Sequence, residues 1–274
     1  MMPVPSASPA GMFGGLWRHR QLIVQLARQE IIGRYRGSLL GVGWSFITPI
    51  LMLLIYTFVF SVVFGARWSG LEHGGKTAFA IVLFLGMAVF SLFSEVVVRA
   101  PMMVVSNANY VKRVVFPLEI LPVVQMVNAL FHFAVSLLAW VLAALWVLGR
   151  VPVTALALPV VIVPVVAGSL GVAWALASLG VYLRDLGQTI TLFVTAALFL
   201  TPIFYPIEAI PETYRHYMMM NPLAHAIEQA RWVMIEGRLP SLLTILTSWA
   251  VGFVMMWLGY AWFQKTRAGF ADVL

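Results

Sequence analysis

The sequence predicts an all-α polytopic membrane protein with six transmembrane helices. Of its 274 residues, 62% are apolar and only 10% are charged, whereas a soluble domain averages about 45–50% apolar and about 25% charged residues. The mean hydropathy is +0.95, and six long uncharged runs follow one another along the chain. Because one span uses about 20 apolar residues, six spans leave room for short loops and for no separate soluble catalytic domain.

The segment before the first span divides into two parts. Residues 1–15 are rich in Pro, Ser, Gly and Ala and lack the continuous apolar stretch of a signal peptide, so we expect a flexible cytoplasmic tail. In residues 16–36, apolar side chains recur at helical spacing among arginines, which predicts a basic amphipathic helix on the inner membrane surface. This helix either docks a cytosolic partner or anchors the chain to lipid.

The uncharged runs define the expected spans, and the distribution of basic residues orients them. Eleven of the 17 Lys and Arg residues fall on the side of the two termini, which places both termini in the cytoplasm. The runs cover residues 37–66, 77–94, 120–149, 151–183, 186–207 and 239–264.

The fifth run is broken by Thr201-Pro202-Ile203-Phe204-Tyr205-Pro206. A helix from 186 to 200 is about 22 Å long, shorter than the hydrocarbon core of about 30 Å. Irregular backbone at this depth requires burial in protein or contact with a water-filled cavity. The apolar segment 208–238 that follows predicts two short external re-entrant helices, which form either a gate over a pathway or a structural cap.

Two patterns suggest enzyme chemistry, and both are weak. The segment 70–77 matches the phosphate-loop pattern G-x-x-x-x-G-K-T, but a membrane span precedes it where the motif needs a strand, and it lies on the predicted outer side. We interpret it as a coincidence. Glu208, Glu212 and His216 are spaced by four, although Pro211 interrupts the helix that would align them. The chain has no cysteine, which excludes disulfides and thiolate metal sites.

No acidic residue lies inside the six runs, so an acid buried at mid-membrane for ion-coupled transport is missing. Glu95 and Glu119 lie at cytoplasmic edges, and we expect Glu95 to pair with Arg99 at i, i+4. The third span carries a polar stripe that serves either hydrogen bonding between helices or the lining of a polar conduit. The stripe consists of Gln125, Asn128, His132 and Ser136.

Aromatic side chains concentrate in the first and fifth spans. Their flat apolar faces allow a sugar chain to slide past without slow-releasing hydrogen bonds, although packing against lipid is the alternative for each of them. The candidate path residues are Trp44, Tyr56, Phe60, Phe64, Phe193, Phe199, Phe204 and Tyr205.

Five short motifs follow one another along the chain, at residues 34–49, 111–117, 182–186, 201–206 and 221–223. In this order they resemble the membrane subunit of type-2 ABC exporters for lipid-linked polysaccharides such as O-antigen, capsule or teichoic acid, and the resemblance runs from Leu16 to the C-terminus. Thr201 stands where the family pattern has Ser, which keeps the hydroxyl.

The resemblance implies a six-span transmembrane domain over residues 37–274 that works as a homodimer with two cytosolic ATP-binding subunits. ATP and Mg²⁺ would then be bound by the partner, and the chain itself would have no cofactor, metal site or catalytic residue. The substrate would be a polyprenyl-pyrophosphate-linked polysaccharide that crosses a bacterial inner membrane, and no nucleic acid is expected.

The resemblance also assigns roles to particular segments. The conduit would form at the dimer interface from the first and fifth spans, with gate helices at 208–238. The coupling segment, 101–117, would meet the ATP-binding subunit through Asn107, Asn109, Tyr110, Lys112 and Arg113, although a solvated loop is the alternative. Four cytoplasmic arginines are candidates to attract the pyrophosphate, because guanidinium can bind phosphate bidentately. They are Arg34, Arg36, Arg99 and Arg184.

Two alternatives remain open at this point. One is a type-2 ABC exporter of small hydrophobic compounds, which would share the fold. The other is a membrane-embedded enzyme of glycan or lipid assembly that uses Glu208, Glu212 and His216.

Overall fold

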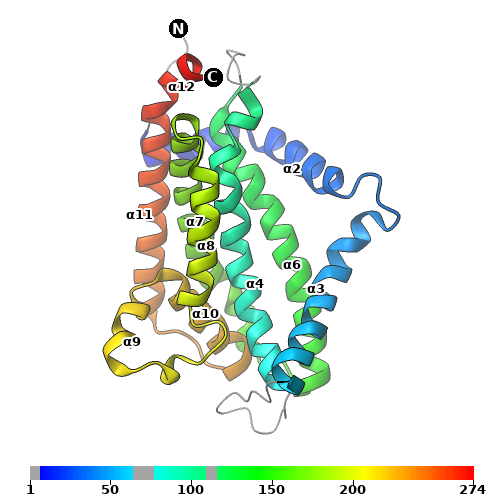
Figure 1. The fold of residues 1–274 in the computed structure, drawn as a ribbon. Coiled ribbons are helices and arrows are strands. Elements are labelled where there is room, and N and C mark those ends of the chain that lie inside the picture. Colours follow the sequence, from blue (N-terminus) through cyan, green and yellow to red (C-terminus); the bar gives the residue numbers. More distant parts are fainter. Residues whose placement is uncertain (1–6, 64–76, 109–115) are drawn as a thin grey trace.

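The computed structural model describes residues 7–63, 77–108 and 116–274, and every regular element within these ranges is helical. Long helices run side by side in one bundle, and α2 crosses near the end at which α12 lies (Figure 1). The helices are α1 (Pro9–Arg18), α2 (Arg20–Arg34), α3 (Trp44–Tyr56), α4 (Thr77–Arg99), α6 (Leu121–Leu148), α7 (Leu158–Tyr182), α8 (Leu186–Leu200), α9 (Glu212–Met219), α10 (Pro222–Arg231), α11 (Leu242–Thr266) and α12 (Phe270–Val273).

Five of the helical segments in the described ranges are long and apolar enough to cross a membrane. They are Gly41–Phe60, Thr77–Met102, Leu118–Leu148, Val153–Tyr182 and Leu242–Val273, and each overlaps one of the expected runs. The remaining expected run contains α8, which has 15 residues and ends at Leu200. Over the described residues there are therefore five helices of spanning length and one shorter apolar helix, where six spans were expected.

Helix α4 lies at the centre of the bundle. It contacts α3, α6, α7, α8 and α10, and its apolar side chains are buried around most of its circumference. A helix that is apolar on all sides satisfies this position, because every face meets protein rather than water. The indole of Trp140 on α6 donates a hydrogen bond to the Ile81 carbonyl at 2.8 Å, which fixes α6 against α4.

Helices α7 and α11 make the most extensive contact in the bundle. Glycines allow their backbones to touch: a Cβ atom at Gly259 would overlap the carbonyl oxygen of Gly171, and one at Gly171 would overlap that of Met255. Small residues at such contacts let helices approach closely, which is a main source of helix association in membranes.

The N-terminal segment differs from the expected flexible tail of residues 1–15. Ser8 caps α1 by accepting a hydrogen bond from the Gly11 amide at 3.1 Å, and Pro9 occupies the first helical position. Met12 is buried in the main apolar cluster. Ser8 and Pro9, whose residue types suggested a flexible chain, here begin a helix.

Helix α2 lies within the expected amphipathic segment 16–36. Its Ile23 and Ala27 are buried against Ile120 and Val124 at the start of α6, and its arginines remain exposed. The apolar face of this helix is therefore occupied by the chain itself.

Candidate functional site

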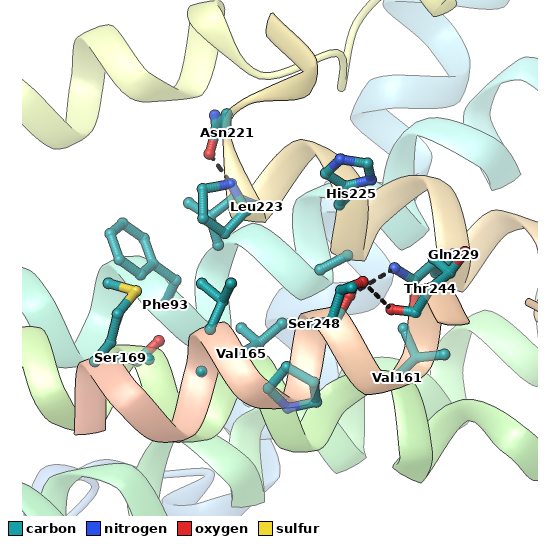
Figure 2. Close-up of a pocket in the computed structure, with 18 of the residues that line it drawn as sticks. Phe93, Val161, Val165, Ser169, Asn221, Leu223, His225, Gln229, Thr244 and Ser248 are labelled. Carbon is teal, nitrogen blue, oxygen red and sulfur yellow. Dashed lines mark hydrogen bonds between the residues drawn. The ribbon is translucent and has the colours of Figure 1, made fainter. Parts of the chain in front are cut away.

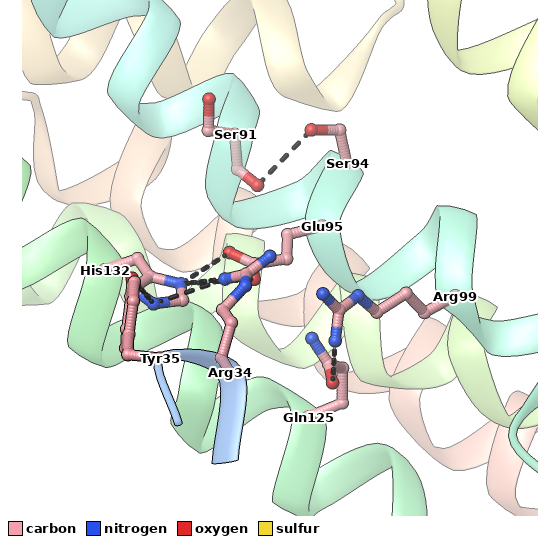
Figure 3. Close-up of polar contacts among 8 residues, drawn as sticks. All are labelled: Arg34, Tyr35, Ser91, Ser94, Glu95, Arg99, Gln125 and His132. Carbon is pink, nitrogen blue, oxygen red and sulfur yellow. Dashed lines mark hydrogen bonds and ion pairs between the residues drawn. The ribbon is translucent and has the colours of Figure 1, made fainter. Parts of the chain in front are cut away.

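A polar cluster joins three helices near the end of α2 (Figure 3). Arg34, the last residue of α2, donates a hydrogen bond to Glu95 of α4 at 2.8 Å. His132 of α6 lies 3.1 Å from the same carboxylate through Nδ1. The Tyr35 hydroxyl lies 3.3 Å from His132 Nε2. The interface helix is thus tied by charged and polar side chains to two membrane spans.

The expected pairing of Glu95 with Arg99 is wrong. Glu95 turns toward α2 and α6, where it meets Arg34 and His132, while Arg99 donates to Gln125 Oε1 at 3.3 Å (Figure 3). Local spacing on one helix predicted the i, i+4 pair, but partners on neighbouring helices compete for the same carboxylate.

The polar stripe of α6 is divided between partners. Gln125 and His132 bond to other helices, as interhelical hydrogen bonding predicts. Asn128 is buried, and within the described ranges no group bonds its Oδ1. The stripe is therefore packed against other parts of the protein between Gln125 and His132.

A second group of contacts holds the irregular segment after α8. The buried Thr201 donates from Oγ1 to the Ala197 carbonyl at 2.7 Å and accepts from Asn221 Nδ2 at 3.1 Å. Asn221 also caps α10, since its Oδ1 accepts from the Leu223 amide at 3.0 Å. One side chain thus joins the break after α8 to the beginning of α10.

Arg231 holds the same segment from the other end of α10. Its Nη2 donates to the Ile203 carbonyl at 3.0 Å, and its Nη1 pairs with Glu228 at 2.6 Å. Backbone that leaves a helix at membrane depth needs internal hydrogen-bond partners. Arg231 supplies such a partner for the Ile203 carbonyl, and Asn221 bonds the side chain of Thr201. We call Thr201, Ile203, Asn221 and Arg231 the re-entrant clip.

The ion pair inside the re-entrant clip is buried at an electrostatic cost. Burial raises the pKa of Glu228 above its ordinary value, although Arg231 opposes this shift. Burial likewise lowers the pKa of Arg231, against the attraction of Glu228. Both shifts favour the neutral forms, so desolvation outweighs the attraction between the two charges.

Three of the eight predicted path aromatics form a continuous run. Phe60 stacks on Phe204 with ring centroids 6.0 Å apart, and Phe204 stacks on Phe199 at 5.7 Å. Phe60 also stacks on Phe79 at 5.6 Å, a residue of α4 that the sequence analysis did not select. Phe79 lies in a long apolar run, where nothing distinguishes it from other buried residues.

The other described path candidates are not stacked in this run. Trp44 and Phe193 are exposed on α3 and α8, and Tyr56 is half-buried. The Tyr205 hydroxyl donates to the Phe199 carbonyl at 2.7 Å, which holds the irregular segment against the end of α8. Phe64 lies outside the described residues.

Two of the four candidate pyrophosphate arginines, Arg34 and Arg99, lie in the polar cluster of Figure 3. Arg34 and Arg99 are engaged with Glu95 and Gln125, whereas Arg36 and Arg184 are exposed. Of the coupling candidates, Asn107 donates to the Met103 carbonyl at 2.8 Å. Asn109, Tyr110, Lys112 and Arg113 lie outside the described residues, as do residues 70–76 of the phosphate-loop pattern.

The enzyme-like residues have no site geometry. Glu212 and His216 are exposed on α9, and Arg215 donates to the backbone carbonyls of Glu208 and Ile210. In the part of the chain that the structure describes, no three His, Asp or Glu side chains come together as a possible metal site.

Comparison with known proteins gives a consistent result along the chain. The sequence profile described as ABC-2 type transporter matches residues 21–235. An O-antigen export system permease protein, RfbA, of Myxococcus xanthus is 29% identical over 94% of this chain and 96% of its own length. RfbA of Klebsiella pneumoniae is 26% identical over 92% and 95%. The polysialic acid transport protein KpsM of Escherichia coli is 23% identical over 76% and 79%.

Proposed function

We propose that this chain, which belongs to the ABC-2 type transporter family, exports a polyprenyl-pyrophosphate-linked polysaccharide as the transmembrane subunit of an ATP-driven system. The observation that carries the proposal is the nearly end-to-end similarity to proteins named for O-antigen export. A protein named for polysialic acid transport is similar over 76% of this chain. Those two names share a polysaccharide cargo and differ in its sugar, so the class of substrate is proposed and the repeat unit is left open.

The aromatic run supports a path for such a substrate. Phe60, Phe204 and Phe199 connect the end of the candidate span Gly41–Phe60 to the end of α8, and these two elements belong to the spans assigned to the conduit. Stacked rings present apolar surface that sugar C–H groups can contact weakly. We propose that a second copy of the chain completes this conduit.

The six apolar runs contain no acidic residue that could couple transport to an ion gradient. This supports a separate ATP-binding partner as the source of energy. The candidate coupling elements are α2 and the segment 107–113, and the cluster of Arg34, Glu95 and His132 connects α2 to α4 and α6. A force applied to α2 from the cytosol would therefore reach two membrane spans directly. In this proposal two such subunits bind ATP and Mg²⁺, the chain has no catalytic role, and it lies in a bacterial inner membrane with cytoplasmic termini.

The short α8 is proposed to complete a sixth crossing together with the re-entrant segment 201–206. Helices α9 and α10 would then lie toward the outer surface as a gate. The re-entrant clip supports this proposal because it joins the end of α8 to both ends of α10.

Deletion of the chain tests the function. In a cell that makes a surface polysaccharide, the expected result is loss of surface polymer together with accumulation of lipid-linked polymer in the cytoplasm. Unchanged surface polymer would favour an exporter of small hydrophobic compounds. Loss of polymer synthesis itself would favour a membrane enzyme, and alanine at Glu208, Glu212 and His216 would then abolish activity.

Cysteine crosslinking tests the partner, since the chain has no native cysteine. Single cysteines at Asn109 or Tyr110 should capture an ATP-binding protein in intact membranes. A cysteine at Tyr217, exposed on α9, is the matched control and should capture none. Equal capture from both positions would contradict the proposed coupling surface.

A further inference from the structure

A cavity of about 640 Å³ lies between α7, α10 and α11 (Figure 2). Its exposed rim includes Met220 and Pro222 beside α10, and Thr247 and Val251 on α11. Two of its walls, α7 and α11, belong to candidate membrane spans. The cavity therefore lies between two candidate spans and α10, one of the helices proposed to lie toward the outer surface.

The walls are apolar with a few uncharged polar side chains. The cavity is lined entirely by described residues, and none of them is Asp, Glu, Lys or Arg. At one end Gln229 donates to the Ser248 hydroxyl at 3.1 Å, so these two side chains satisfy each other (Figure 2). A volume within about 300–1,000 Å³ and a mostly apolar lining with few polar groups are typical of ligand sites.

Among the residues that line the cavity, Ser169 has a buried hydroxyl without a partner in the described chain. It lines the cavity from α7 and is only 2% exposed, and no group in the described chain bonds its Oγ. Buried hydroxyl groups nearly always have a partner. A buried water needs about two to four polar partners, whereas Figure 2 places Ser169 beside Phe93 and Val165. A partner for this hydroxyl is therefore best supplied by an occupant of the cavity.

We propose that this cavity binds an uncharged lipid that bears a hydroxyl or carbonyl group. The hydrocarbon body lies between α7 and α11, and the oxygen bonds Ser169. The lining holds no Lys or Arg, and its one titratable side chain is His225. A phosphate headgroup would therefore meet no permanent positive charge, which a buried anion needs. The lining includes Asn221, which bonds Thr201 of the irregular segment. Helices α3 and α11 lie on opposite sides of the bundle (Figure 1). None of the stacked rings of Phe60, Phe79, Phe199 and Phe204 lines the cavity, so this proposal does not rest on the proposed function.

Photolabelling in membranes that contain the full chain tests the proposal. The probe is a long-chain alcohol with a diazirine on its chain, compared with the corresponding alkane and the corresponding phosphate monoester. The alcohol should label α7 or α11, and Ser169→Ala should reduce the label about fivefold, the change expected for one hydrogen bond. Equal labelling by the alkane, or preferential labelling by the phosphate, would overturn the proposal.

Two valines on α11 provide a matched pair of variants. Val251 is 47% exposed and lines the cavity, whereas Val254 is 52% exposed and does not. Val251→Trp should fill the cavity and abolish labelling, and Val254→Trp should leave it unchanged. Equal labelling of both variants would locate the probe on the outer lipid surface. Absent labelling, with a cysteine at Val251 crosslinking two copies of the chain, would show that a second protomer covers the mouth. Either outcome would overturn the proposal.

Discussion

The side-chain amide of Asn221 donates a hydrogen bond to the hydroxyl of Thr201 across 3.1 Å. The two residues belong to separate sequence motifs, residues 201–206 and 221–223, and each motif is short by itself. This hydrogen bond shows that the two motifs act together in the fold. Thr201 closes the end of α8, Asn221 begins α10, and the hydrogen bond fixes one helix end relative to the other.

Removal of this contact should weaken the re-entrant clip. Thr201→Val keeps the volume but loses the hydroxyl, so we expect a loss of about 1 kcal/mol in the free energy of unfolding. Asn221→Ala should cost more, since it also removes a helix cap worth about 1 kcal/mol. Thermal unfolding of the purified protein measures both effects.

Two further variants separate the hydrogen bond from general changes in α8. Thr201→Ser retains the hydroxyl and should behave like the original chain. Thr195→Val removes a hydroxyl that bonds only within α8 and should have little effect. If Thr195→Val destabilises the protein as much as Thr201→Val, the contact with Asn221 has no special importance.

The glycine contacts between α7 and α11 predict that two glycine-to-alanine variants of α7 differ in stability. Gly171→Ala should destabilise the helix pair by about 1–3 kcal/mol, because a Cβ there overlaps backbone of α11 that cannot move independently. Gly168→Ala is the matched control on the same helix, where the added methyl meets only the Met255 sulfur at 3.7 Å. Thermal unfolding should rank the two variants in this order, and equal stability would contradict the packing described.

The extent to which the sequence predicts this structure differs between elements. Long apolar runs such as 77–94 and 151–183 predict α4 and α7 because hydrophobicity alone determines a membrane span. The break after Leu200 is also predicted, since Pro202 and Pro206 cannot continue a helix. By contrast, α1 was not predicted, because Ser8 and Pro9 begin a helix in a composition that is otherwise typical of flexible chain.

Contacts between distant residues account for the other differences. Arg231 meets Ile203 across 28 positions, and Arg34 meets Glu95 across 61. No periodicity in the sequence encodes such pairs, so local spacing suggested Glu95 with Arg99 instead. The short motifs could be recognised in the sequence, whereas the residues that they contact could be identified only from the structure.

The contact of Arg34 with Glu95 predicts that charge reversal is tolerated better in pairs than singly. Arg34→Glu places two acids beside each other, and Glu95→Arg places two bases there. The double reversal should recover about 1 kcal/mol relative to the sum of the single losses, a modest value because Arg34 is partly exposed. Thermal unfolding of the four proteins gives this coupling energy, and Arg28→Glu, exposed on the same helix, should show no coupling with Glu95→Arg.

The aromatic run predicts the effect of removing one ring. Phe60→Ala breaks the stack that joins Phe79 to Phe204, so we expect slower export of long polymer with little change in protein abundance. Phe58→Ala is the matched control, since Phe58 is 60% exposed on the same helical stretch. Surface and cytoplasmic polymer, separated by length after a pulse of labelled sugar, measure the rate. If the two variants slow export equally, or if neither does, the ring of Phe60 does not line the path. A difference in export rate between Phe60→Ala and Phe58→Ala that grows with polymer length would support sliding of the polymer along the aromatic run, because each additional sugar must pass the same rings.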